Sequence, residues 1–443
     1  MRSTLFYLPH EWMGIPWTGW GWLLAIWTVL GLIAGWLAFR RQGMAKALTE
    51  GLPGWLLVAG VILWLLPRME TYLEDGSAEG RWLGIPVRGY GLMLTTGVLS
   101  ALAICSHRSR RLGLTPDSLY SLALWTCAGG IAGARIFYVV QKWSLLPGES
   151  WREKLWTAIQ FTEGGLVVYG AVMGGMVAIW AWCRRNRQKV LAILDLVAPG
   201  FLLGLAFGRI GCLLHGCCFG GVCHAHWLPH IAFPAGSEPY LSQVLDGALL
   251  GLQLEPEKSS GSRRILAVEP GSWAAGQGIR SGQRVEGLEP IVSWPPADRD
   301  PAGPRPTGAR LRIDGRPFLI PPESLPQRSL PLHPAQLYAS LNALFLTVLL
   351  YLAWSWPRRD GVILGSGLIL YGLLRILEEV IRDDERGQFG TTLTISQWVS
   401  LAGIAFGLAL LVWLRNRPIG RVCDHYAQPT TMGSPGQPRS SVG

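Results

Sequence analysis

Nine apolar stretches, most of them close to the roughly 20 residues that cross a bilayer as a helix, restrict the fold of this 443-residue chain more than any other feature. They lie at about 20–38, 53–67, 89–105, 118–140, 165–183, 190–208, 334–354, 361–381 and 396–414, and the second is the shortest. In lipid, every backbone polar group has to be satisfied within the protein, which favours helices. The sequence therefore predicts an all-α polytopic membrane protein with about nine transmembrane helices.

Basic residues gather in the loops after the odd-numbered stretches. They are Arg40, Arg41, Lys46, Arg108, Arg110, Arg111, Arg184, Arg185, Arg187, Lys189, Arg358, Arg359, Arg415, Arg417 and Arg421. Loops rich in Lys and Arg stay in the cytoplasm, so we expect the N-terminus outside and the C-terminus inside. Membrane topology thus accounts for the net charge of +10, and no nucleic-acid partner is needed to explain it.

The longest loop, 213–332, has balanced charge and falls on the outer side, where we expect an extracytoplasmic insertion. Residues 265–288, ILAVEPGSWAAGQGIRSGQRVEGL, resemble the PDZ pattern of a strand, Pro-Gly-Ser, a short Ala-rich helix and a second strand. Residues 311–320 predict a strand pair around Asp314-Gly315, and the Pro-rich stretch 294–306 predicts a loop. A PDZ-like segment would offer a groove for an extended peptide, whereas a spacer is the simpler alternative.

A few charged residues fall inside the apolar stretches, where charges are costly and therefore mark functional candidates. They are Arg135, Asp195, Arg209, Arg375, Glu378, Glu379 and Arg382. Arg375 and Glu379 are four residues apart and share one helix face, with Arg382 one turn further along it. This spacing predicts an inward-facing ion pair, whose simplest role is to lock two helices together.

Arg209, Arg375 and Arg382 all fall near the outer leaflet in the predicted topology. Guanidinium groups suit phosphate through bidentate, charge-assisted hydrogen bonds, so these arginines indicate a pocket for a phospholipid headgroup. The glycine-rich stretch 163–175 starts from the same face and places Tyr169 among its glycines. Close packing of helices through small residues explains this stretch equally well.

Eight blocks together resemble the prolipoprotein diacylglyceryl transferase family. In chain order they are RGYGLML (88–94), GARIFYV (133–139), EGGLVVYGAVMGG (163–175), DLVAPG (195–200), GRIGCLLHGCCFG (208–220), HPAQLYAS (333–340), YGLLRILEEVIR (371–382) and ISQWVS (395–400). The resemblance covers roughly residues 85–220 and 330–415. It implies transfer of the diacylglyceryl group from phosphatidylglycerol to the lipobox cysteine of prolipoproteins, forming a thioether and releasing glycerol phosphate.

The resemblance also assigns roles to residues. Arg209 and Arg375 match the essential arginines, Glu379 matches the helix partner of Arg375, and Tyr169 stands where many members have histidine and is the candidate proton acceptor. The candidate phosphatidylglycerol-binding residues are Arg209, Arg375, Tyr90, Gly165, Gly170, Gly220, His333, Gln336 and Arg382. His333 is a second, weaker candidate for relaying the proton. No cofactor or metal is required by this scheme.

The signature departs from the family pattern at Cys212 and Cys217, positions often filled by asparagine and glutamate. Four cysteines cluster on the outer side, where disulfides can persist: Cys212, Cys217, Cys218 and Cys223. Three interpretations remain open: a disulfide that braces the loop, reduced cysteines that pack, and a zinc site, although the spacing matches no common zinc pattern.

The predicted organisation has five parts. They are two extra N-terminal helices (1–84), the first part of the membrane core (85–222), the insertion (223–331), the second part of the core (332–420) and a disordered cytoplasmic tail (421–443).

We expect a bacterial cytoplasmic (inner) membrane location. The expected partners are phosphatidylglycerol, prolipoprotein signal peptides with a lipobox cysteine, membrane lipids and a peptide bound by the insertion. The alternative function is a non-catalytic lipid-binding scaffold or transporter, for which an internal repeat would be expected and is not visible.

Overall fold

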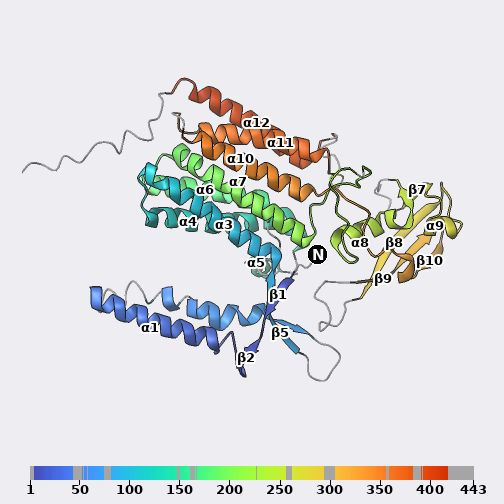
Figure 1. The fold of residues 1–443 in the computed structure, drawn as a ribbon, viewed down its shortest axis with the longest axis horizontal. Coiled ribbons are helices and arrows are strands. Elements are labelled where there is room, and N and C mark those ends of the chain that lie inside the picture. Colours follow the sequence, from blue (N-terminus) through green and yellow to red (C-terminus); the bar gives the residue numbers. More distant parts are fainter. Residues whose placement is uncertain are drawn as a thin grey trace, which may run out of the picture. The chain divides into compact units, whose positions relative to one another are not determined.

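The structure is a computed structural model (Figure 1). It describes residues 4–42, 52, 54–56, 58–73, 81–146, 150–159, 165, 167–225, 227–255, 262–293, 305–355, 359–382, 391 and 393–417. Its contacts divide the chain into two compact units. One comprises Met1–Leu94 and Ile210–Gln336, and the other comprises Thr95–Arg209 and Leu337–Gly443. The tail predicted to be disordered, 421–443, lies outside the described residues.

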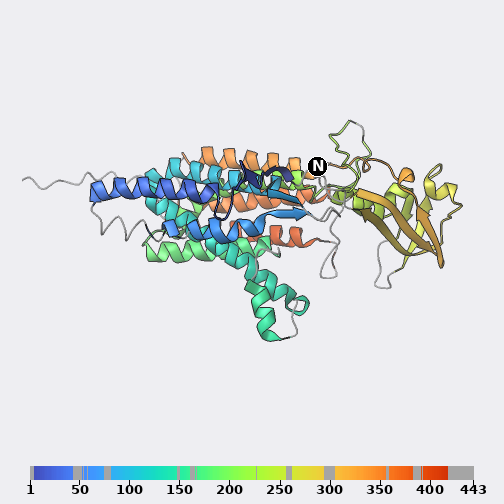
Figure 2. The same ribbon diagram turned by 90° about the horizontal axis from the view of Figure 1, so that it is seen from below.

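Outside the N-terminal region and the insertion, the described residues form eight α-helices. They are α3 (Gly89–Ser109), α4 (Pro116–Lys142), α5 (Trp151–Ile159), α6 (Val168–Arg185), α7 (Val190–His215), α10 (Ala335–Ala353), α11 (Val362–Glu379) and α12 (Ile395–Leu414). In the unit formed by 95–209 and 337–443, Leu119, Trp182, Ile193, Leu346 and Ile363 form a core with contributions from α4, α6, α7, α10 and α11. Figure 2 shows α5 projecting away from the other helices of this unit.

Small residues set the closest helix contacts in this unit. A Cβ added at Gly170 of α6 would lie 2.4 Å from the carbonyl oxygen of Gly133 in α4, so the two backbones meet there. Gly365 of α11 and Gly407 of α12 make a similar contact, because a Cβ on Gly407 would lie 2.8 Å from the oxygen of Gly365. Such approaches are the usual means by which helices associate in lipid.

Among the described residues, five helices are long and apolar enough to cross a membrane: Gly89–Leu112, Pro116–Lys142, Val190–His215, Ala335–Ala353 and Ile395–Leu414. The chain is therefore a multi-pass membrane protein. The predicted fifth and eighth spans also form helices, α6 and α11, but α11 carries Arg375, Glu378 and Glu379. The first two spans correspond to the shorter apolar helices Trp22–Leu37 and Gly54–Met69, the first of which lies within α1 (Trp22–Gln42).

The chain is mostly helical as predicted, but strands that the prediction did not include lie at the N-terminal end. Strands β1 (Thr4–Leu8), β4 (Thr71–Leu73) and β5 (Arg81–Arg88) form an antiparallel sheet in the order β1-β5-β4. A two-stranded hairpin joins β2 (Glu11–Trp12) to β3 (Ile15–Pro16). Side chains of β1 alternate between more buried and more exposed, as expected for a strand with one covered face. A search for long apolar stretches does not detect the two-residue alternation of a short strand.

The insertion is a five-stranded antiparallel sheet with two short helices. Its elements are α8 (Glu238–Leu245), β6 (Leu252–Leu254), β7 (Arg263–Val268), α9 (Trp273–Gly276), β8 (Arg284–Ser293), β9 (Arg305–Ile313) and β10 (Arg316–Ile320), and the strand order is β10-β9-β8-β7-β6. The predicted pattern of strand, short Ala-rich helix and strand is confirmed by β7, α9 and β8, and Ser272 caps α9. The predicted strand pair is confirmed by β9 and β10, which turn at Asp314 and Gly315, both at positive φ. Most of the Pro-rich stretch lies outside the described residues.

The two ends of the insertion are held side by side. Val222 forms an antiparallel bridge with Leu332, and the Cys223 amide donates a hydrogen bond to the Pro331 carbonyl over 2.8 Å. Leu332 also exchanges two hydrogen bonds with Ile231, of 2.9 and 3.0 Å. The chain thus leaves for the insertion and returns from it through one narrow neck.

Candidate functional site

The predicted ion pair of α11 is present and buried. Arg375 Nη1 lies 2.5 Å from Glu379 Oε2, and the two side chains are 8% and 3% exposed. The spacing of four residues stacks them on one face of the helix, as expected. Leaving either charge alone in such an environment would be costly, so each group depends on the other.

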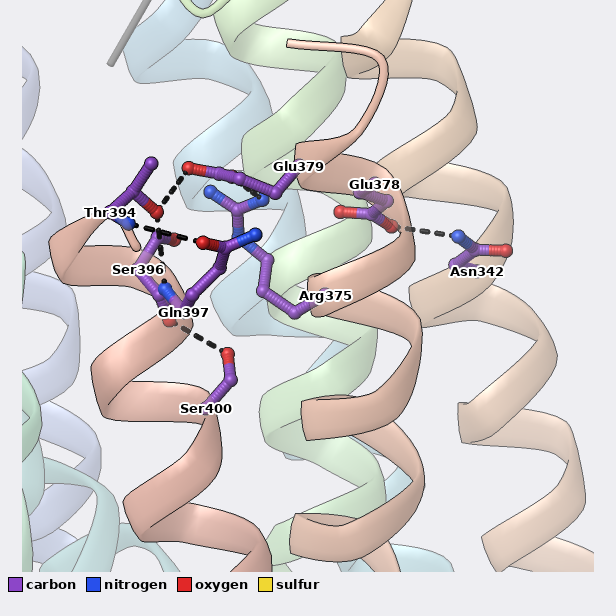
Figure 3. A network of polar contacts seen from close by, with 8 residues as sticks. All are labelled: Asn342, Arg375, Glu378, Glu379, Thr394, Ser396, Gln397 and Ser400. Atoms are coloured by element: carbon purple, nitrogen blue, oxygen red, sulfur yellow. Dashed lines mark hydrogen bonds and ion pairs between the residues drawn. The ribbon is translucent and has the colours of Figure 1, made fainter. Parts of the chain in front are cut away.

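The second oxygen of Glu379 is held by the next helix. Thr394 Oγ1 donates a hydrogen bond of 2.6 Å to Glu379 Oε1 (Figure 3). The same hydroxyl accepts from the amide of Gln397, whose side chain accepts in turn from the Thr394 amide, forming a capping box at the start of α12. The carboxylate therefore has a fixed orientation, and it fixes the guanidinium of Arg375.

Glu378 faces a different neighbour. Its Oε1 accepts a hydrogen bond of 2.7 Å from Asn342 of α10, and Figure 3 shows this contact on the side of α11 away from Thr394. Sequence reasoning missed Asn342 and Thr394. An uncharged polar residue within the apolar sequence of α10 was the only available signal for Asn342.

Arg382 does not extend the helix face as predicted. Helix α11 ends at Glu379, and the amides of Val380, Ile381 and Arg382 donate to carbonyls three residues earlier. This tighter hydrogen bonding is a common way to satisfy the last carbonyls of a helix, and it takes Arg382 out of the α-helical period.

Arg209 and Tyr169 occupy helices of the same unit. Arg209 is partly buried on α7, six residues before the helix ends. Tyr169 is the second residue of α6, and 40% of its surface is exposed. Both side chains make interactions within the protein.

Arg135 of α4 binds backbone carbonyls and has a structural role. Its guanidinium donates to the carbonyls of Ala158, Thr157 and Gly165, over 2.8, 2.6 and 3.3 Å, and so holds α5 and the segment before α6. Gly165 has a φ of +75°, and a Cβ there would lie 2.6 Å from the Tyr138 ring. The glycine at 165 is thus required by local packing, as at Gly170, where the α4 backbone occupies the space.

Asp195 caps the other end of α11. Its buried carboxylate accepts hydrogen bonds of 2.8 Å from the amides of Gly361 and Leu364. Amides at a helix N-terminus lack helical partners and favour negative charge, so this carboxylate anchors α7 to α11.

Three of the four clustered cysteines come together at the end of α7. The sulfurs of Cys212, Cys217 and Cys218 all lie within 4.8 Å of one another. Hydrogen bonding with Cys212 and Cys218 raises the pKa of Cys217 above its ordinary value, and burial adds to the shift. The thiol of Cys223 instead donates to the Ala225 carbonyl over 3.4 Å.

The bracing disulfide is not formed. Cys212, Cys217, Cys218 and Cys223 carry no disulfide, and the same holds for the other three cysteines that the structure describes. The neck described above already fixes this loop, because backbone hydrogen bonds join 221–223 to 331–333. A covalent link between Cys223 and the other three is therefore not needed for the loop to be ordered.

Four predicted substrate-binding residues lie beside the cysteine turn or the end of α7 that leads into it. Gln336, which is 1% exposed, donates from Nε2 to the Cys217 carbonyl over 2.8 Å. The Gly220 amide donates to the His333 carbonyl over 3.0 Å. Tyr90, at the start of α3, packs against Gly211 of α7, where an added Cβ would lie 3.1 Å from its ring.

Comparison with known proteins identifies relatives over most of the chain. A sequence model of the family described as prolipoprotein diacylglyceryl transferase matches residues 81–413. A phosphatidylglycerol–prolipoprotein diacylglyceryl transferase from Rhodopirellula baltica is 36% identical over 93% of this chain and 89% of its own. Transferases of that name from Gloeobacter violaceus and Clostridium tetani are each 33% identical, over 38% and 31% of this chain and 62% and 53% of their own. The family match includes the helices that carry Arg209, Arg375 and Glu379.

Proposed function

The chain belongs to the prolipoprotein diacylglyceryl transferase family, and we propose on this premise that it transfers the diacylglyceryl group of phosphatidylglycerol to the lipobox cysteine of prolipoproteins. The product is a thioether, and glycerol phosphate leaves. The observation that carries the proposal is the buried Arg375–Glu379 pair, oriented by Thr394, in a helix within the family match. The two substrates are those that the name of its Rhodopirellula baltica relative contains.

Arg375 and Arg209 are proposed to bind the phosphate of the lipid. When the glyceryl carbon–oxygen bond breaks, its electron pair stays on the phosphate, whose negative charge increases. A preoriented guanidinium stabilises that increase more than it stabilises the bound lipid, which is the condition for catalysis. Glu379 keeps Arg375 in place, so we assign it a positioning role.

The acceptor thiol has to lose its proton, because the thiolate is the nucleophile. We propose that Tyr169 accepts or relays this proton, with His333 as the weaker candidate. Tyr90, Gly220, Gln336 and Arg382 are proposed to contact phosphatidylglycerol. For Gly165 and Gly170 the same proposal is weaker, since packing alone accounts for a glycine at each position.

We also propose the finer membrane arrangement expected from the charge pattern. It comprises nine spans, an outer N-terminus, a cytoplasmic C-terminus and a bacterial inner-membrane location. The insertion, 223–331, is then extracytoplasmic. Labelling of single cysteines introduced at residue 255 and at residue 187 with a membrane-impermeant reagent tests this, because only the first is expected to react in intact cells.

The insertion is proposed to be PDZ-like and to bind an extended peptide. Strand β6 lies at the edge of the five-stranded sheet, and an edge strand can pair with an added strand. Deleting 223–331 should then weaken peptide binding and leave transfer to short lipobox peptides intact. Equal binding of such peptides with and without the insertion favours a spacer.

The decisive test is a transfer assay with purified protein, radiolabelled phosphatidylglycerol and a lipobox peptide, alongside its Cys→Ser counterpart. Label is expected on the cysteine peptide alone. Arg209→Ala and Arg375→Ala should insert into membranes and abolish transfer, while Arg415→Ala, in a predicted cytoplasmic loop, serves as the control. Lipid binding without transfer would instead support the non-catalytic scaffold.

A further inference from the structure

We infer that Cys212, Cys217 and Cys218 form a three-thiolate site for a zinc ion, whose fourth coordination position receives the acceptor thiol. The second half of this inference rests on the proposed transfer function. The first half rests on geometry alone: three sulfurs lie within 4.8 Å of one another at the end of α7.

A tight turn brings the three sulfurs together. The amides of Gly216 and Cys217 both donate to the Cys212 carbonyl, over 2.8 and 3.1 Å, so the chain folds back over the last turn of α7. Gly216 has a φ of +92°, and Cys218 has a φ of +57°, which is uncommon for a residue with a side chain. Such a conformation persists only where the surroundings impose it, and it turns the Cys218 side chain toward the other two.

The surroundings of the turn are fixed by the first turn of α10 and the residues just before it. Gln336 holds the Cys217 carbonyl through Nε2, and the Gly220 amide is bonded to the His333 carbonyl. The Oε1 atom of Gln336 is buried and has no hydrogen-bond partner among the residues that the structure describes. A buried acceptor of this kind is costly to leave unsatisfied, which indicates that a donor from a bound molecule completes its hydrogen bonding.

Ligand chemistry selects the ion. Thiolates bind zinc and other soft ions, whereas magnesium and calcium require oxygen ligands. Zinc–sulfur bonds of about 2.3 Å in tetrahedral geometry place the sulfurs about 3.8 Å apart, so the cluster has to contract by about 1 Å at most. Among the described residues, the group contains three ligand atoms, which leaves one tetrahedral position open, as in catalytic zinc sites.

An open position on a thiolate-bound zinc suits the proposed reaction. A zinc ion held by the three cysteines would favour the thiolate form of the acceptor, whose proton would pass to Tyr169 as proposed above, and the thiolate would attack the glyceryl carbon. The new carbon–sulfur bond replaces the carbon–oxygen bond, whose electron pair leaves with glycerol phosphate. Zinc keeps its oxidation state throughout, and no further reactant is needed.

Cobalt titration of the reduced, full-length protein in nanodiscs tests the site, since cobalt replaces zinc and reports thiolate ligands by a charge-transfer absorption. We expect one cobalt per chain, displaced by zinc. Cys217→Ser and Cys218→Ser should weaken binding by at least about 100-fold. The matched control Cys223→Ser, which removes a neighbouring thiol outside the cluster, should bind as the parent does. Absence of the band, or an equal band in the triple Cys→Ser variant, overturns the site.

A measurement on the unmodified protein avoids the risk that a Cys→Ser variant misfolds. Mass mapping of thiol alkylation should show that zinc protects Cys212, Cys217 and Cys218, while Cys223, which lies outside the cluster, reacts at the same rate with and without zinc. Equal reactivity of the three cysteines in both samples overturns the inference.

The acceptor position is tested with the cobalt-loaded protein. A lipobox peptide should change the charge-transfer band, and its Cys→Ser counterpart should not; equal responses overturn the acceptor role. If the band and the thiol response are present but transfer is absent, the metal site stands and the proposed function fails. If metal-free protein transfers at the full rate, the function stands and the acceptor role is overturned.

Discussion

Two arginines in the same helical unit, Arg135 of α4 and Arg375 of α11, are used in opposite ways. Arg135 gives its guanidinium to three backbone carbonyls, and these contacts hold a short helix in place. Arg375 is paired with the carboxylate of Glu379, which Thr394 orients from a second helix. The role of an arginine in an apolar helix therefore depends on its partners. An arginine bonded to backbone carbonyls is structural, whereas one paired with an oriented carboxylate keeps a charge in a fixed position where a substrate can use it.

Substituting lysine at Arg375 should give the largest effect on this comparison. Lysine keeps the charge opposite Glu379 but loses the planar fork that suits phosphate. We expect the transfer rate to fall by about 100-fold or more, with little change in thermal unfolding. Rate and unfolding temperature are measured on the same preparation, and a normal rate would remove Arg375 from the phosphate site.

The matched substitution Arg135→Lys should have the reverse signature. One ammonium cannot reproduce the three directed bonds to Ala158, Thr157 and Gly165, and hydrogen bonds to charged groups each stabilise by about 1.5–3 kcal/mol. We expect the free energy of unfolding to fall by about 2 kcal/mol and the rate of the folded fraction to stay unchanged. A rate loss without destabilisation would assign Arg135 to the site.

Glu379→Gln sharpens the comparison from the partner side. The amide retains the shape and a hydrogen bond from Thr394 but leaves Arg375 without its countercharge. We expect about a tenfold lower rate, which corresponds to about 1.4 kcal/mol of transition-state stabilisation. The effect should appear in kcat more than in KM, because Glu379 positions Arg375 to stabilise the negative charge that develops on the leaving phosphate in the transition state. Unchanged kcat would reduce Glu379 to a structural role.

Thr394→Val should give the smallest effect. It removes the hydroxyl that both orients Glu379 and caps α12, and the loss of a cap is worth about 1 kcal/mol. We expect a few-fold lower rate together with a small drop in unfolding temperature. Thr394→Ser retains the hydroxyl and should restore both; failure to restore the rate would contradict the orienting role.

The features that could be predicted from the sequence depend on residues close together in the chain. The ion pair of α11 follows from a spacing of four residues, and the β9–β10 turn follows from Asp314-Gly315, so both were within reach of the sequence. Partners from other elements were not. Thr394, Asn342 and the carbonyls around Arg135 meet their partners only through tertiary packing, and α5 is a nine-residue helix within a polar loop.

The cysteines and the N-terminal sheet mark two further limits. Spacing alone could not decide between a disulfide, packing and a metal site, because the answer depends on the positive φ angles of Gly216 and Cys218. The pairing of β1 with β5 joins residues some eighty positions apart, and neither strand is long enough to stand out beside the helices.

The neck at Val222 and Leu332 gives the chain a modular character. Because the two ends of the insertion are adjacent, the segment between them can vary in length or be exchanged without displacing the helices, and this junction acts as a node. Over generations such a node allows a module to be gained, replaced or lost while the helices are inherited unchanged. For the protein engineer, it is the place to attach a domain of choice to a membrane enzyme.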